Sequence, residues 1–129
     1  MRLLLISYYF PPCGGATVQR WLKWLPILVE KGFEVTVLTT KDGDYPVLDK
    51  SLLSEIPPDI TIIRTKTFQW KKIWNLFFGN KKPMPYGNIS KNKEQNLINR
   101  ILIWVRLNLI IPDIRKFWNP YALKKAIEY

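Results

Sequence analysis

The chain contains 129 residues, of which 47% are hydrophobic and 14% are aromatic; this is enough apolar surface for the core of one domain and excludes a disordered tail. The formal net charge is +10, and all of the excess follows Arg64, because cations and anions cancel from Met1 through Arg64. Such an asymmetry indicates an anionic partner, which is a membrane surface, a phosphorylated substrate or a nucleic acid. The single Cys excludes an internal disulfide and is typical of a reducing compartment.

The chain begins with an apolar run from Arg2 to Tyr8, which predicts a parallel strand that is covered on both faces. The run does not resemble a signal peptide, since Pro11 and Pro12 follow at once and no small-residue cleavage site is present. The longest apolar stretch, residues 97–111, is too short and too charged to span a bilayer. We therefore expect a cytoplasmic protein. Peripheral attachment to the inner face of the cell membrane is compatible with this location.

A turn at residues 11–15 separates this strand from a predicted helix. Gly32 stands where the C-cap of that helix belongs. Pro26 removes a backbone hydrogen bond inside the helix, so it predicts a kink or an early break. The apolar stripe that predicts the helix consists of Val18, Trp21, Leu22, Leu25, Leu28 and Val29.

Two further strands are predicted after the helix. Residues 33–40 are rich in β-branched side chains and alternate in polarity, and residues 60–64 form a second β-branched run. Residues 51–56 are expected to form a short helix between them. The order strand, helix, strand with short links predicts a parallel βαβ unit.

The last part of the chain is predicted to be helical. We expect helices at residues 70–77 and 94–111, a mobile polar loop at residues 79–93, and a final helix from Tyr121 to Tyr129. Asn119 and Pro120 are the predicted N-cap and first-turn proline of that final helix. The fold class is therefore α/β, a Rossmann-like parallel sheet with flanking helices. A doubly wound domain would place a fourth strand next, so we expect residues 1–129 to be the incomplete front part of such a domain.

The turn after the first strand carries the strongest chemical signal. Gly14 and Gly15 leave room for a phosphate to approach the free backbone N–H groups at the start of a helix. A tight structural turn is the alternative, since paired glycines after a strand are common. The segment matches neither the Gly-x-Gly-x-x-Gly dinucleotide fingerprint nor a P-loop, which disfavours nicotinamide and ATP.

The order of several segments resembles the bacterial family-4 glycosyltransferases of the GT-B fold. The resemblance begins with residues 5–12, continues through Gly14-Gly15 and Val18-Gln19-Arg20-Trp21, and spans most of the chain. Its later parts are residues 32–40, 49–57, 104–106 and 111–115, with Trp118.

This resemblance implies the front of a GT-B N-terminal domain, which in that family binds the acceptor. The C-terminal domain, which binds most of the nucleotide-sugar, would then be absent from residues 1–129, and this part alone would be inactive. The implied function is transfer of a sugar from a nucleotide-sugar to a glycan or lipid-linked acceptor during synthesis of surface polysaccharide or lipopolysaccharide. The implied partners are those two substrates, and no metal or other cofactor is expected.

The resemblance also places residues in the site. Gly14 and Gly15 would donate backbone hydrogen bonds to the donor diphosphate, and Arg20 is a candidate anion contact, although a solvated helix charge is the interpretation that we favour. The catalytic residue stays unknown: for Asp113 we favour an N-cap or an ion pair with Arg115 over a base. Cys13 is expected to be a packing residue.

A basic and aromatic surface is the second candidate site, and two interpretations of it stay open. It docks on anionic lipid or holds the acceptor, or its aromatics are core and its cations are solvated. The first interpretation also supports an alternative function, a non-catalytic membrane-surface or interaction module; nucleic acid is disfavoured because no known module is present. The residues of this surface are Trp70, Lys71, Lys72, Trp74, Arg100, Trp104, Arg106, Arg115, Lys116 and Trp118.

Overall fold

The computed structural model describes residues 1–69, 104 and 113–129. In this part of the chain, strands and helices alternate as far as the third strand, and two helical elements follow it. They are β1 (Arg2–Ile6), α1 (Ala16–Glu30), β2 (Glu34–Thr40), the 3-10 helix η1 (Ser51–Glu55), β3 (Thr61–Thr65), the 3-10 helix η2 (Ile114–Trp118) and α4 (Asn119–Ile127).

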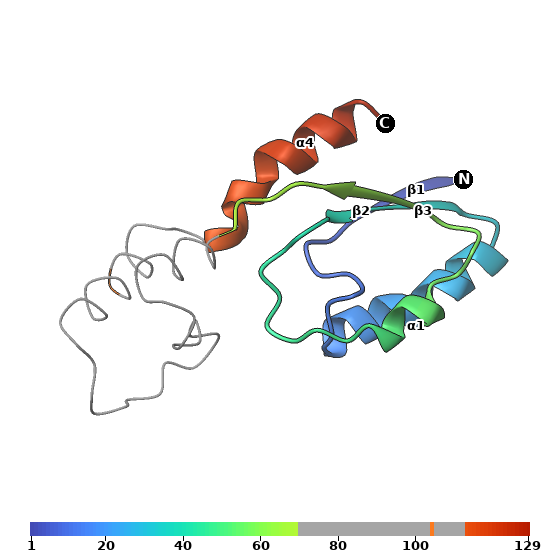
Figure 1. The fold of residues 1–129 in the computed structure, drawn as a ribbon. Helices are drawn as coiled ribbons and strands as arrows, with labels where there is room; N and C mark the ends of the chain where they lie inside the picture. The colour runs from blue at the N-terminus through green and yellow to red at the C-terminus, as the bar shows by residue number, and fades with distance from the viewer. Residues whose placement is uncertain (70–103, 105–112) are drawn as a thin grey trace.

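The three strands form one parallel sheet in the order β1-β2-β3. Leu4 of β1 lies opposite Thr36 of β2, and Thr36 lies opposite Thr61 of β3. The sheet is covered by α1 on one face and by α4 on the other (Figure 1). The predicted α/β class with a parallel sheet and flanking helices is therefore confirmed.

Alternate residues of β2 supply the two layers of the core. Val35 and Val37 pack with Leu25 on the α1 face. Leu38 packs with Trp118 and the small Ala122 on the α4 face. All residues of β2 after Glu34 are buried, because a central parallel strand is covered on both sides.

Helix α1 ends as the sequence predicts but does not break at Pro26. Gly32 has a φ of +78°, and its N–H donates to the carbonyl of Val29, while the N–H of Phe33 donates to that of Leu28. These two bonds form a Schellman motif, which favours glycine at this position. The helix runs through Pro26 to Glu30, so the early break did not occur.

The helix at the end of the chain begins earlier than predicted. Trp118 is its N-cap and Asn119 already lies within it, because η2 runs directly into α4 and no side chain needs to cap the junction. The predicted helices at residues 70–77 and 94–111 and the predicted loop at residues 79–93 lie outside the described residues, except for Trp104.

Candidate functional site

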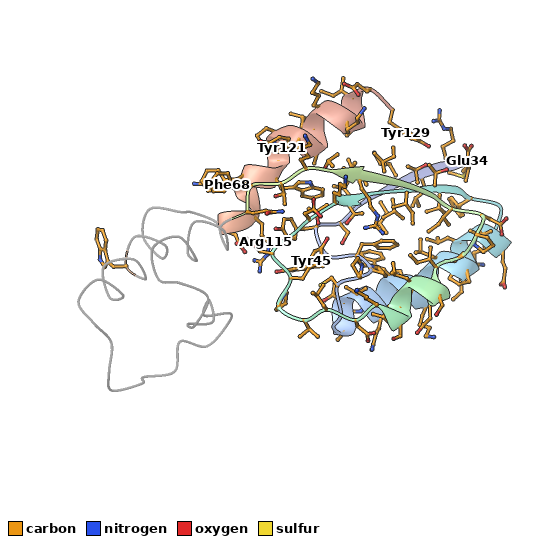
Figure 2. All side chains as sticks on the ribbon, in the orientation of Figure 1. Glu34, Tyr45, Phe68, Arg115, Tyr121 and Tyr129 are labelled. Atoms are coloured by element: carbon orange, nitrogen blue, oxygen red, sulfur yellow. The ribbon has the colours of Figure 1, made fainter. Side chains whose placement is uncertain are left out.

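The carboxyl ends of the three strands meet at one edge of the sheet, and polar side chains gather there. The Thr40 hydroxyl donates to the carbonyl of Tyr8 at 3.1 Å and contacts the Tyr45 hydroxyl at 2.8 Å. The Trp118 indole donates to the Thr65 hydroxyl at 2.7 Å. Figure 2 shows Arg115 and Tyr45 at this end of the sheet. In open α/β folds this is the edge where ligands bind.

Helix α1 begins at this edge without a cap. Gly15 is its N-cap residue, with φ 115° and ψ 162°, and no side chain caps it. Its carbonyl accepts from Val18 and Gln19. Among the described residues, the N–H groups of Gly15, Ala16 and Thr17 have no acceptor. The first turn also holds no acidic residue, so its donors and the positive end of the helix dipole are free for an anion.

Gly14 differs from its neighbour, because the structure already uses its N–H group. That N–H donates to the carbonyl of Val47 at 3.0 Å, and a Cβ at this position would lie 3.2 Å from side-chain atoms of Val47 and Asp49. Gly14 is buried and allows residues 47–49 to pack against the turn. Its predicted bond to phosphate requires the bond to Val47 to open, so Gly15 is the glycine of the pair whose backbone N–H is free.

Arg20 lies beside the start of α1 in an open hollow. The hollow has a volume of about 500 Å³ and is lined by Ala16, Gln19, Arg20, Lys23 and Glu55. Lys23 is paired with Glu55 at 3.2 Å, whereas Arg20 has no ion-pair partner among the described residues. Arg20 is exposed, so the two interpretations of its role, an anion contact and a solvated charge, both remain.

Arg115 packs its guanidinium group against two tyrosines that follow β1. Its Cζ atom lies 4.8 Å from the centre of the Tyr9 ring and 5.9 Å from that of Tyr8, which is within the range of cation–π attraction. Burial raises the pKa of the Tyr9 hydroxyl, and the Arg115 charge opposes that rise. Both hydroxyls of this pair therefore stay protonated near neutral pH, since burial also raises the pKa of Tyr8.

Asp113 has the structural role that the sequence indicates. Its side chain accepts from the backbone N–H of Arg115 at 3.2 Å and so caps η2. It also forms an ion pair with the Arg115 guanidinium. The N-cap and the ion pair are therefore both confirmed, and both occupy the carboxylate that a base would need.

Cys13 is a buried packing residue, as expected. Its side chain is 1% exposed, and burial raises the pKa of the thiol from its ordinary value of 9.0 to about 11. A thiol that stays protonated is a poor nucleophile.

Arg64 belongs to this edge and was not predicted as a site residue. It follows Ile62 and Ile63 in β3, and its Nη2 atom donates to the carbonyl of Pro11 at 2.8 Å. The signal was present in the sequence: a cation inside a β-branched run stands near the carboxyl end of a strand, where ligands bind. Within a β-branched run, however, Arg64 has no local feature that distinguishes it from an ordinary strand residue.

The structure removes Trp118 from the predicted basic and aromatic surface. The side chain is 6% exposed and packs between β3 and α4, because its indole N–H finds a buried partner in Thr65. Trp104 is 57% exposed, and the Lys116 ammonium lies over the Phe117 ring. The other predicted members outside the described residues are Trp70, Lys71, Lys72, Trp74, Arg100 and Arg106.

Comparisons with known proteins do not assign the chain to a family. No family model matches the chain, and searches of curated proteins and of solved structures found no match. Within residues 1–69, 104 and 113–129, no helix is long and apolar enough to cross a membrane. The same residues hold no cluster of three or more side chains suited to a metal ion.

Proposed function

We propose that this chain is part of a glycosyltransferase that moves a sugar from a nucleotide-sugar to a glycan or lipid-linked acceptor. The observation that carries the proposal is the uncapped start of α1 at the carboxyl edge of a parallel sheet. The resemblance to the GT-B family 4 at the sequence level supplies the reaction, since the fold alone is compatible with many activities.

The chemistry of the α1 start suits a phosphate group. Gly15 takes a backbone conformation that side chains resist, and it holds three successive N–H groups at the end of the sheet. No Cβ blocks the approach at Gly15, where nothing lies within 4 Å of the position that a Cβ would take. A diphosphate is large enough to accept bonds from several of these donors at once.

A matched pair of glycine variants tests this proposal. Gly15→Ala forces the alanine into a φ near 115°, whereas Gly32→Ala places an alanine at a φ of 78° at the far end of α1. Each change is expected to cost about 1 to 3 kcal/mol of folding free energy. Binding of UDP-, GDP- and dTDP-linked sugars, measured by calorimetry below the melting temperature, should weaken in Gly15→Ala alone.

Equal binding by the two variants would contradict a phosphate contact at the α1 start. Absence of binding by the parent chain to every nucleotide-sugar would contradict a donor contact at the α1 start, which is the observation that carries the proposal.

A second candidate function is docking on an anionic membrane surface, and one observation favours it. Exposed aromatic and aliphatic side chains surround an open hollow of about 820 Å³ beside α4, with a lysine at its border. Apolar side chains next to cations are typical of interfacial binding. The lining residues are Phe68, Lys116, Phe117, Asn119, Pro120, Tyr121 and Leu123.

Vesicle sedimentation separates this candidate from the first. Leu123→Glu places a charge on an exposed side chain of the hollow and should reduce binding to phosphatidylglycerol vesicles at low salt. Leu53→Glu makes the same change at an exposed site outside the hollow and serves as the control. Equal vesicle binding by both variants would rule out this surface.

A further inference from the structure

Arg64 is a partly buried cation without a carboxylate partner. Its only hydrogen bond among the described residues goes to the carbonyl of Pro11 at 2.8 Å, and no acidic side chain of that part of the chain pairs with it. A guanidinium carries five N–H donors. Among the described residues, the buried side-chain nitrogen and oxygen atoms without a hydrogen-bond partner belong to Thr39 and Arg115. The remaining donors of Arg64 are therefore accessible to solvent.

Arg115 approaches the same turn from the other side of the fold. Its guanidinium stacks on Tyr9, and its charge acts on the Cys13 thiol, whose pKa it tends to lower against the larger effect of burial. Its Nε–H is buried without a partner, and Asp113 takes one Nη1 bond. A buried donor without a partner is costly unless a ligand or water satisfies it.

We propose that Arg64 and Arg115 form a two-arginine site for a diphosphate at the turn of residues 11–15. The proposal rests on the proposed function and extends it, because it places the charge of the ligand on side chains as well as on the α1 start. Arginine suits this task, since its planar fork binds two phosphate oxygens at once. Asp113 opposes the ligand electrostatically and sets how strongly Arg115 attracts it.

Arg64→Lys is the first test, with inorganic pyrophosphate as the probe and the 129-residue chain as the protein. Lysine keeps the charge and a donor for the Pro11 carbonyl but loses the fork. We expect the pyrophosphate Kd to rise about 10-fold. Arg2→Lys makes the same change on an exposed residue at the opposite edge of the sheet and should leave that Kd unchanged. Equal Kd values for the two variants would overturn the site.

Asp113→Asn tests the contribution of Arg115 with an opposite sign. Asparagine still caps η2 but removes the negative charge that competes with the ligand. We expect tighter pyrophosphate binding, by about 3- to 10-fold, together with some loss of thermal stability. If the Asp113–Arg115 ion pair has only a structural role, Asp113→Asn will lower stability and leave the pyrophosphate Kd unchanged. That result would overturn the two-arginine site.

Displacement of bound pyrophosphate separates this inference from the proposed function. A nucleotide-sugar and a short prenyl diphosphate both carry a diphosphate, and the proposed function predicts displacement by the nucleotide-sugar. If the prenyl diphosphate alone displaces pyrophosphate and Arg64→Lys still weakens binding, the site stands while the nucleotide-sugar role fails. If the nucleotide-sugar binds with equal strength to the parent chain and Arg64→Lys, the function stands and the arginine site fails.

Discussion

Burial controls the chemistry of Cys13 at the scale of a single residue. The thiol lies in the turn before α1, where its hydrogen donates to the carbonyl of Gly14 at 3.3 Å. Loss of water around the sulfur disfavours the thiolate and so raises the pKa of Cys13. The nearby positive charge of Arg115 favours the thiolate and offsets part of that rise. The cysteine therefore packs the turn in place, and the backbone donors of Gly15 carry the proposed chemistry.

A pH dependence follows from this pKa. The unfolded thiol ionises near 9.0 and the folded thiol near 11, so the unfolded state binds fewer protons between these values. The free energy of unfolding should then fall as pH rises from 9 to 11, by roughly 2 kcal/mol. Urea denaturation across this range measures the slope.

Cys13→Ala is the control for that slope. Tyr8 and Tyr9, whose pKa values burial also raises, are present in both proteins, and Cys13 is only a minor cause of the Tyr9 shift. The alanine variant should lose stability less steeply as pH rises. Parallel curves for the two proteins would show that burial does not raise the pKa of the Cys13 thiol above its unfolded value.

At the scale of secondary-structure elements, Trp118 joins the end of the chain to the sheet. It stands between η2 and α4, stacks edge-to-face on Tyr8 with ring centres 5.6 Å apart, and bonds to Thr65 at the end of β3. Because Arg115 lies three residues before it, this anchor also holds the guanidinium against the carboxyl edge.

Trp118→Phe should therefore destabilise the fold. The change removes the bond to the Thr65 hydroxyl and part of a buried ring, for a cost of about 1 to 3 kcal/mol. Trp24→Phe is the matched control, since that ring is 53% exposed and its loss should cost less than about 0.5 kcal/mol. Chemical denaturation of both variants checks the difference, and equal midpoints would contradict the anchor.

The elements that the sequence predicts well are those with strong local patterns. The apolar stripe of α1, the β-branched run of β2 and the Gly32 cap are all local, and the structure confirms each of them. Asn119 was misplaced because a 3-10 turn precedes α4 and makes a side-chain cap unnecessary. The burial of Trp118 depends on a contact with Thr65, which is distant in the chain. The periodicity of apolar residues within one element does not predict such a contact.

The candidate site was predictable only in part, for the same reason. The turn of Gly14 and Gly15 is visible in the sequence, but the bond that occupies Gly14 comes from Val47. Arg64 and Arg115 reach this turn from two elements that lie far apart in the chain. The parallel sheet brings Arg64 to this edge with the end of β3, whereas η2 holds Arg115 there against the Tyr9 ring.

At the scale of the whole molecule, the two ends of the strands differ: structural contacts lie at the amino edge of the sheet, and candidate binding groups lie at the carboxyl edge. At the amino edge, the Thr36 hydroxyl donates to the Tyr129 hydroxyl at 2.8 Å, and the Cζ atom of Arg2 lies 4.7 Å from the Tyr129 ring. Figure 2 shows Tyr129 and Glu34 at this end, opposite Arg115 and Tyr45. The amino edge thus fixes α4 on the sheet, while the carboxyl edge holds the open donors.

The backbone amide signals of the chain give the most direct test of a nucleotide-sugar site at that carboxyl edge. In a heteronuclear NMR titration with nucleotide-sugars, we expect the amide signals of Gly15, Ala16 and Thr17 to shift with added ligand, while that of Gly32 stays in place. Shifts that spare the α1 start, or that spread evenly over both edges of the sheet, would contradict the account.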